Sequence, residues 1–285
     1  MTTPRDILHE YGIKPRKKLG QSFLTDVNTI NKIAASACIS PDDVVVEIGA
    51  GIGVLTRDIA QIARQVIAVE IDPHLVATLH DQLAFCTNTE IHSGDILKFD
   101  FASISNKYNT KVKVIGNIPY NISSPVIFHL LSSRSAISCF TLMLQKEVVQ
   151  RLVSLPDNKN YGVPSVLLQM YAEVKRLFDV PATCFYPQPK VESSIIQGTF
   201  LEKSLVELAD EKIFSQLVKA SFAQRRKMLI NNLKNAKFLE ELSDSDLKFA
   251  LDAAGIDGKR RGETLSLFEF GNLSNILKNR LTYTR

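Results

Sequence analysis

The chain has 285 residues, of which 45% are hydrophobic and 22% charged, and its formal net charge at pH 7 is +4. These values are ordinary for a soluble globular protein with one large domain, or with a large and a small one. The N-terminus lacks the apolar core of a signal peptide, and no apolar run approaches the roughly 20 residues of a membrane-spanning helix. We therefore expect a protein that is neither secreted nor embedded in a membrane.

Cysteine and histidine are too scattered to form a disulfide framework or a zinc site. The four cysteines form no CxxC pair, and the five histidines form no HExxH motif. Isolated cysteines are typical of a reducing compartment, and a zinc site needs clustered ligands. The sequence thus predicts a cytoplasmic protein without a metal ion.

Apolar runs alternate with helical periodicities along the first 200 residues or so. Asp26 is a typical N-cap for the first predicted helix, which extends to about residue 37. Strands are predicted at 44–48, 66–71, 90–92, 112–115, 139–144, 174–178 and 195–200. Helices are predicted at 55–63, 75–83, 124–131, 147–153 and 166–171. This alternation predicts an α/β fold with a mainly parallel sheet, helices on both faces and an antiparallel edge pair.

The spacing of the apolar residues changes after about residue 202. From Ser204 onward the apolar positions recur only at helical spacing, and no convincing strand remains. We therefore expect a large α/β domain of residues 1–202 and a small all-α domain of residues 203–285.

The strongest single pattern is a glycine-rich loop directly after the first predicted strand. Gly49, Gly51 and Gly53 stand at alternate positions and lead into a helix, with Glu47 two residues before the first of them. Glycine lets the backbone turn sharply and lets a ligand approach closely. The spacing differs from the GxGxxG of dinucleotide-binding proteins, and a P-loop lysine is absent. The loop therefore disfavours an NTPase and a nicotinamide dehydrogenase.

Acidic residues follow the next two predicted strands. Glu70 ends the second strand, where a carboxylate can hydrogen-bond both hydroxyls of a ribose. Asp95 follows the third strand and can accept a hydrogen bond from an adenine amino group. Taken singly, each is also compatible with a solvated strand end or a turn. In order after Gly49, they predict a pocket for an adenosine-like ligand.

The fourth strand ends in the loop Asn117-Ile118-Pro119-Tyr120. Pro119 fixes its own φ and biases Ile118 toward an extended conformation, so the loop is stiff. Such a loop can simply end a strand, since Asn and Pro are common turn residues. In an open α/β sheet, however, ligands bind at the carboxyl ends of the strands.

Read in this order, the pattern resembles class I methyltransferases that use S-adenosylmethionine, and the Asn-Ile-Pro-Tyr loop resembles that of enzymes acting on adenine N6. Further segments narrow the resemblance, over about residues 11–270, to the small-subunit rRNA adenine dimethyltransferases, the RsmA or KsgA family. These segments are Gly20-Gln21-Ser22-Phe23-Leu24, Leu144-Gln145-Lys146-Glu147-Val148, Phe185-Tyr186-Pro187-Gln188-Pro189-Lys190-Val191 and Phe222-Ala223-Gln224-Arg225-Arg226-Lys227. The resemblance implies a Rossmann-like catalytic domain with a seven-stranded sheet, followed by a helical RNA-binding domain.

The resemblance also implies roles for single residues. S-adenosylmethionine would contact Ser22, Leu24, Gly49, Gly51, Glu70, Ile71, Asp95, Ile96 and Asn117. Among these, the two glycines would hold its methionine part, Glu70 its ribose, and Ile71, Asp95 and Ile96 its adenine. Catalysis would involve Asn117, Ile118, Pro119, Tyr120 and Phe185. The family usually has Asn where this chain has Ser22, whose shorter side chain predicts a weaker or water-bridged contact.

The loop residues suit methylation of an amino group whose lone pair is delocalised into a ring. The Asn117 side-chain oxygen and the Ile118 carbonyl can each accept one N–H of adenine, which aims the nitrogen lone pair at the methyl donor. No strong base is required, because the methylated cation is acidic. Tyr120 offers a stacking face for a flipped-out base and Phe185 a second wall, although Phe185 also suits a core position.

Basic residues gather in three clusters, at residues 14–18, 219–234 and 259–261. The second contains Lys219, Arg225, Arg226 and Lys227. On a helix it forms a basic stripe beside apolar residues. A charge run is often only a solvated face, and a basic amphipathic helix can also bind a membrane. Three clusters accompanying a base-methylating pocket favour contacts with RNA phosphates.

The resemblance predicts transfer of methyl groups to N6 of two adjacent adenines in a hairpin near the 3′ end of 16S rRNA, giving N6,N6-dimethyladenosine during ribosome biogenesis. The partner would be the immature 30S subunit, and we expect a monomer. One alternative is a large-subunit rRNA adenine methyltransferase of the antibiotic-resistance type. Another is a catalytically silent RNA-binding assembly factor that retains the fold.

Overall fold

A computed structural model of the protein describes residues 3–283, except for the side chains of Lys17 and Tyr283. The chain divides into two compact units. Unit 1 comprises Met1–Val149 and Val174–Phe200, and unit 2 comprises Gln150–Glu173 and Leu201–Arg285. Residues 150–173, which the sequence assigns to the large domain, group with the C-terminal helices. Residues 1–2 and 284–285, at the outer ends of the two expected domains, lie outside the described residues.

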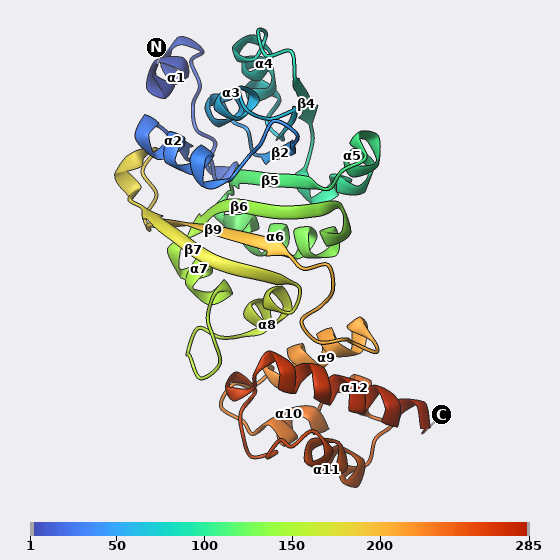
Figure 1. Ribbon diagram of the computed structural model, residues 1–285. Helices are drawn as coiled ribbons and strands as arrows, with labels where there is room; N and C mark the ends of the chain where they lie inside the picture. Colours follow the sequence, from blue (N-terminus) through green and yellow to red (C-terminus); the bar gives the residue numbers. More distant parts are fainter. Residues whose placement is uncertain (1–2, 284–285) are drawn as a thin grey trace. The chain divides into compact units, whose positions relative to one another are not determined.

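A seven-stranded sheet with the order β4-β3-β2-β5-β6-β9-β7 forms the centre of unit 1 (Figure 1). Its strands are β2 (Val44–Ile48), β3 (Gln65–Glu70), β4 (Thr89–Ser93), β5 (Val112–Asn117), β6 (Ile137–Gln145), β7 (Ala172–Val180) and β9 (Ser193–Phe200). The strands from β4 to β6 pair in parallel, whereas β9 is antiparallel to β6. The predicted mainly parallel, Rossmann-like sheet is thereby confirmed.

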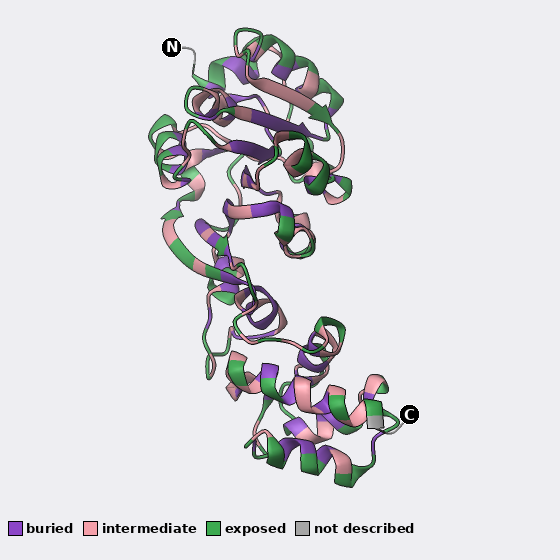
Figure 2. Ribbon diagram, turned by 45° about the vertical axis from the view of Figure 1, so that its right-hand side comes forward, coloured by how far each residue is buried: buried purple, intermediate pink, exposed green. Residues whose placement is uncertain are grey.

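Burial on both faces explains the continuous apolar runs of the central strands. All five residues of β2 are buried, as Figure 2 shows for the middle of the sheet, and strands covered on both faces lose the usual apolar–polar alternation. Gly116 lets β5 lie close to β2, because a Cβ at this position would stand 2.6 Å from the Ile48 carbonyl oxygen. The carboxyl ends of these two strands are therefore close together.

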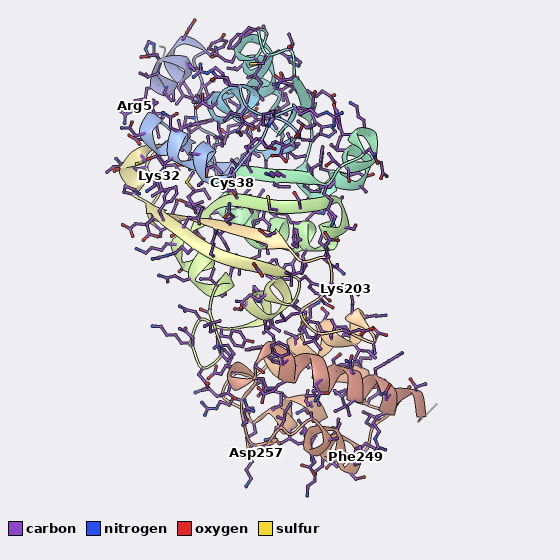
Figure 3. All side chains as sticks on the ribbon, in the orientation of Figure 1. Arg5, Lys32, Cys38, Lys203, Phe249 and Asp257 are labelled. Atoms are coloured by element: carbon purple, nitrogen blue, oxygen red, sulfur yellow. The ribbon has the colours of Figure 1, made fainter. Side chains whose placement is uncertain are left out.

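Helices cover the sheet of unit 1. They are α1 (Pro4–Glu10), α2 (Val27–Ser36), α3 (Val54–Ala60), α4 (Pro73–Gln82), α5 (Phe101–Tyr108) and α6 (Ser123–Ser132), and α7 (Lys146–Leu152) continues into unit 2. Asp26 caps α2 as predicted, since its side chain accepts a hydrogen bond from the Thr29 N–H. Lys32 of α2, labelled in Figure 3, lies with its ammonium group 3.9 Å from the centre of the Phe178 ring in β7. Such a cation–π contact ties the helix to the edge strand.

A second, two-stranded sheet joins distant parts of unit 1. β1 (Phe23–Leu24) pairs antiparallel with β8 (Phe185–Tyr186). The Thr25 N–H extends this contact with a hydrogen bond to the Cys184 carbonyl oxygen. The N-terminal segment is thus fixed to the chain that leads from β7 to β9.

Unit 2 is helical throughout its C-terminal part, as predicted. It contains α8 (Val163–Gln169), α9 (Glu211–Ser221), α10 (Leu229–Lys234), α11 (Asp244–Ala253) and α12 (Leu267–Tyr283). The expectation of one basic helix over residues 219–234 was wrong, because α9 ends at Ser221. The Ser221 carbonyl accepts a hydrogen bond from Asn232 Nδ2 at 3.0 Å, and a Cβ on Gly262 would lie 2.5 Å from the same oxygen. The Ser221 carbonyl at the end of α9 is thus bonded to a side chain that lies later in the sequence, and Gly262 packs closely against it.

Across residues 3–283, no helix combines the length and the apolar character that crossing a bilayer would require. Within the same residues, no three or more His, Cys, Asp or Glu side chains gather where they could hold a metal ion. The absence of a metal cofactor stays a prediction.

Candidate active site

The parallel strands bring the predicted cofactor and catalytic residues to one pocket in unit 1. β2, β3 and β5 all end at this pocket, and the chain after β4 reaches it at Gly94. Its lining includes Ser22, Leu24, Gly49, Gly51, Glu70, Ile71, Asp95, Ile96, Asn117, Ile118, Pro119, Tyr120 and Phe185. The predicted RNA-binding residues belong to unit 2 and are described separately below.

The glycine-rich loop needs glycine for its backbone conformation. Gly49 and Gly51 have φ angles of +69° and +61°, in the left-handed region that strains residues with a Cβ. The Gly49 N–H donates to the Val69 carbonyl at 2.9 Å, and the Gly51 N–H donates to Glu70 Oε2 at 2.9 Å. The loop is therefore folded back onto the end of β3.

Glu70 is a buried carboxylate held by backbone donors. Its Oε1 accepts a hydrogen bond from the Asp72 N–H at 2.9 Å, in addition to the bond from Gly51 to Oε2. Burial raises the pKa of the Glu70 carboxyl, against the lowering effect of these N–H groups. Each oxygen keeps a lone pair for a further donor. The adjacent Ile71 side chain is half exposed in the pocket and offers an apolar surface.

Asp95 is a turn residue that also lines the pocket, and its contact with adenine stays a prediction. Its Oδ1 accepts a hydrogen bond from the Leu97 N–H at 3.0 Å and so caps a short 3₁₀ helix, η2 (Ile96–Lys98). The same residue lines the pocket, and Oδ2 receives no hydrogen bond from the described residues. Asp95 is thus both a turn residue and an available acceptor at the pocket wall.

Glu47 also lines the pocket, although it is not among the predicted site residues. It is the fourth residue of β2 and only 3% exposed, and its Oε2 has no hydrogen-bond partner among the described residues. Burial raises the pKa of the Glu47 carboxyl to about 8, opposed by the nearby Thr56 hydroxyl and assisted by the charges of Glu70 and Asp58. The sequence signal that could have identified Glu47 as a pocket residue is its position two residues before Gly49, the first glycine of the loop.

A segment that we call the N-terminal strap, residues 16–24, closes one side of the pocket. The buried carboxylate of Asp72 holds it, because Gln21 Nε2 donates to Asp72 at 2.9 Å and the Arg16 guanidinium pairs with it at 3.1 Å. The Ser22 hydroxyl donates to the Pro187 carbonyl at 2.9 Å. This serine therefore uses its hydroxyl to fasten the strap, and it also lines the pocket; its contact with a cofactor stays a prediction.

The loop after β5 presents one oriented amide and one anchored ring. Asn117 Nδ2 donates to the Ser22 carbonyl at 3.0 Å, and its side-chain oxygen receives no hydrogen bond from the described residues. The Tyr120 hydroxyl lies 2.8 Å from Ser193 Oγ, and burial raises the pKa of the Tyr120 phenol. Ile118 is fixed by a hydrogen bond from its N–H to the Met143 carbonyl.

Phe185 lies at the boundary between the pocket and the core. Its side chain is 2% exposed and packs in a cluster with Ile33, Met143 and Ile195. The ring also lines the pocket. The structure therefore gives Phe185 a packing role, and its role as a second wall for a base stays a prediction.

The predicted RNA-binding residues lie on the surface of unit 2. Lys219 is in α9, whereas Arg225, Arg226 and Lys227 lie in the turn before α10, and all four are exposed. Arg225 donates from Nε and Nη2 to Glu263 Oε2, at 3.0 and 2.8 Å. Arg226 and Lys227 have no acidic partner among the described residues. Lys17, part of the N-terminal basic cluster, has a side chain outside the described residues.

Comparison with known proteins finds relatives over nearly the whole chain. Residues 12–272 match the family model described as ribosomal RNA adenine dimethylase. A protein of Syntrophus aciditrophicus named ribosomal RNA small subunit methyltransferase A is 44% identical over 278 residues, covering 97% of this chain and 99% of that protein. Its namesake in Bacillus cytotoxicus is 43% identical over 276 residues, covering 96% and 94%.

Two solved structures are similar over most of the chain. A dimethyladenosine transferase from Plasmodium falciparum is 27% identical with a TM-score of 0.77, covering 88% of this chain and 95% of that one. The 23S rRNA methyltransferase ErmE is 28% identical with a TM-score of 0.68, covering 90% and 99%.

Proposed function

Because the chain belongs to the ribosomal RNA adenine dimethylase family, we propose that it transfers methyl groups from S-adenosylmethionine to N6 of adenines in small-subunit rRNA. The proposed target is a pair of adjacent adenines in a hairpin near the 3′ end of 16S rRNA, and the product is N6,N6-dimethyladenosine. The observation that carries this proposal is the single pocket that holds Glu70, Asp95 and the Asn117–Tyr120 loop. The proposed adenosine-binding carboxylates and the proposed adenine-orienting amide thus line the same pocket.

The residues of the pocket fit S-adenosylmethionine. Glu70 supplies carboxylate oxygens with spare lone pairs for ribose hydroxyls, and Asp95 has a free oxygen for an adenine amino group. The half-exposed Ile71 side chain suits the face of an adenine ring. The unpartnered Oε2 of the buried Glu47 suits a cationic or N–H donor. When bound, S-adenosylmethionine supplies a methyl group activated by a sulfonium.

Asn117 and Ile118 would orient the adenine amino group for reaction. Since the Asn117 nitrogen is bound to the Ser22 carbonyl, its oxygen remains to accept one N–H of the base. The Ile118 carbonyl would accept the other N–H. Together they would hold the nitrogen lone pair away from the ring plane, a contribution of positioning and electrostatics. Tyr120 would stack on the base, which is worth about 1–3 kcal/mol.

A second methylation requires the same site to accept a monomethylated amine. That amine has one N–H left, so only one of the two acceptors can be used, and the new methyl group must fit beside the other. The anchored Asn117 side chain would keep its acceptor available in both rounds. We therefore propose that Asn117 serves both transfers.

The helical C-terminal region, proposed as residues 203–285, would bind RNA through exposed cations such as Lys219, Arg226 and Lys227. These charges can contact phosphates without reading the sequence. The proposed partner is the immature 30S subunit, and the protein would act as a cytoplasmic monomer.

Supplying labelled S-adenosylmethionine with unmethylated small subunits and, separately, with large subunits tests the proposal. Mapping the modified base should locate the label at adjacent adenines of 16S rRNA. Label only in 23S rRNA would favour the large-subunit alternative; the similar ErmE is named a 23S rRNA methyltransferase. Cofactor binding without any transfer would favour a silent assembly factor.

A further inference from the structure

The ring of Tyr120 is fixed at the end that faces away from the backbone. Its hydroxyl lies 2.8 Å from Ser193 Oγ, and either group can donate the hydrogen bond. Tyr120 begins a short 3₁₀ helix, η3 (Tyr120–Ile122), at the pocket, whereas Ser193 begins β9. To reach another rotamer, the Tyr120 ring would have to break this hydrogen bond.

Ser193 is a rigid anchor for this bond. Its side chain is fully buried, and it pairs with Gln145 of β6. The preceding residue, Glu192, is held twice by Lys146: the Lys146 N–H donates to the Glu192 carbonyl at 3.0 Å, and the ammonium group lies 2.7 Å from the carboxylate. The start of β9 is therefore fixed on both sides of the serine hydroxyl.

The neighbouring residue, Ser194, has a buried hydroxyl that points to a different partner. Ser194 is equally buried, but its hydroxyl donates to Asp179 at 2.6 Å. Asp179 does not line the pocket. Successive side chains of a strand point to opposite faces, so only Ser193 reaches the loop that carries Tyr120.

We propose that Ser193 is a positioning residue for methyl transfer, which holds the Tyr120 ring at the angle at which it meets the target base. This inference rests on the proposed function. Ser193 is not itself part of the pocket lining and acts through Tyr120. A ring that is fixed before the base arrives holds the amino group at a constant place relative to Asn117, an effect on the transfer step.

The test compares Ser193→Ala, Tyr120→Phe and the double variant in single-turnover methylation of unmethylated small subunits. Each single variant should lower the rate about threefold to tenfold, the range expected for one hydrogen bond. Because both remove the same bond, the double variant should be no slower than the slower single one. Affinities for subunits and for S-adenosylmethionine should remain within about twofold, since neither substitution removes the stacking surface.

Ser194→Ala is the matched control, because it removes a buried serine hydroxyl from the same strand on the opposite face. It should leave the single-turnover rate unchanged. Rate losses that multiply in the double variant, or single variants with the wild-type rate, would overturn the role of Ser193. If Ser193→Ala does not fold, Tyr120→Phe alone still decides, because a wild-type rate would exclude any function for the bond. Wild-type protein that methylates neither subunit would instead refute the proposed function.

Discussion

The side-chain nitrogen of Asn117 donates a hydrogen bond to the main-chain oxygen of Ser22 across 3.0 Å. The partner is a carbonyl, so the amide can present only its nitrogen to the strap and must turn its oxygen elsewhere. The strap therefore determines which atom of Asn117 is available to a substrate.

Asn117→Ala should lower the rate of methyl transfer at least about 100-fold, because it removes an acceptor that acts on the reacting nitrogen. Cofactor affinity should change less than about tenfold, since Glu70 and the glycine loop are untouched. Single-turnover transfer and calorimetry measure the two effects. Asn117→Asp is a sharper variant: it keeps an acceptor but cannot donate to the Ser22 carbonyl, so it should also be slow. If Asn117→Ala dimethylates its substrate at the wild-type rate, the catalytic role proposed for this loop is wrong.

Glu70→Ala should weaken binding of S-adenosylmethionine at least about tenfold, the usual cost of losing hydrogen bonds to a charged group. It also frees the Gly51 N–H, which Glu70 now holds. Isothermal titration calorimetry measures the affinity. Glu90→Ala is the control, because Glu90 is a carboxylate of β4 that pairs with Lys107 on the surface. Equal affinities of the two variants would contradict a ribose site at Glu70.

Glu47 should make the protein less stable as the pH rises. Its pKa is raised from 4.5 to about 8 in the folded state, so between these values the folded protein keeps a proton that the unfolded chain has released. The free energy of unfolding therefore falls across this window, by up to about 1.4 kcal/mol per pH unit from this group. Glu47→Gln should flatten the profile between these two pKa values.

Urea unfolding followed by circular dichroism at several pH values measures that slope. Glu240→Gln, at an exposed position, serves as the control and should reproduce the wild-type profile. Parallel profiles for wild-type protein and Glu47→Gln would show that Glu47 is not protonated in the folded state.

Arg226→Ala combined with Lys227→Ala should weaken RNA binding and make it less dependent on salt. The slope of the logarithm of the binding constant against the logarithm of the salt concentration should fall by about one unit for each phosphate that is no longer neutralised. Arg225→Ala should act differently, because Arg225 is paired with Glu263 and its removal also destabilises the turn. Filter binding at several salt concentrations, with thermal melts of each variant, separates the two effects. Lys237→Ala with Lys248→Ala removes equal charge from exposed positions elsewhere in unit 2. If the double variant at Arg226 and Lys227 shows the wild-type salt slope, this turn does not contact the RNA phosphates.

The central strands of the sheet were predictable because they are apolar runs bounded by turns, such as Val44–Ile48 before Gly49. Glu70, Asp95 and Asn117 were predictable for a related reason, since they lie at or directly after the ends of sheet strands, whereas Ser22, Leu24 and Phe185 were inferred only from the family resemblance. Two helices were missed despite usable signals. α1 begins with a capping box between Thr3 and Asp6, and Asp100 caps α5.

Other features depend on pairings that no local pattern reveals. The two-residue strands β1 and β8 are too short for any periodicity and exist only because they pair. The carbonyl of Ser221, at the end of α9, accepts a hydrogen bond from Asn232 and lies close to Gly262, and both residues lie beyond the helix in the chain. The hydrogen bond from the Ser22 hydroxyl to Pro187 joins positions 165 residues apart, which no local pattern could reveal.

That separation has a consequence for protein synthesis. The strap is translated early, but Pro187 and β8 emerge from the ribosome 165 residues later, about 10–30 s at the usual elongation rates. Until then the strap can be held by Asp72 and Asn117, but the pocket lacks Phe185 and the pairing of β1 with β8. The binding site is thus completed late in translation, and S-adenosylmethionine can stabilise the nascent chain only after most of it has been made.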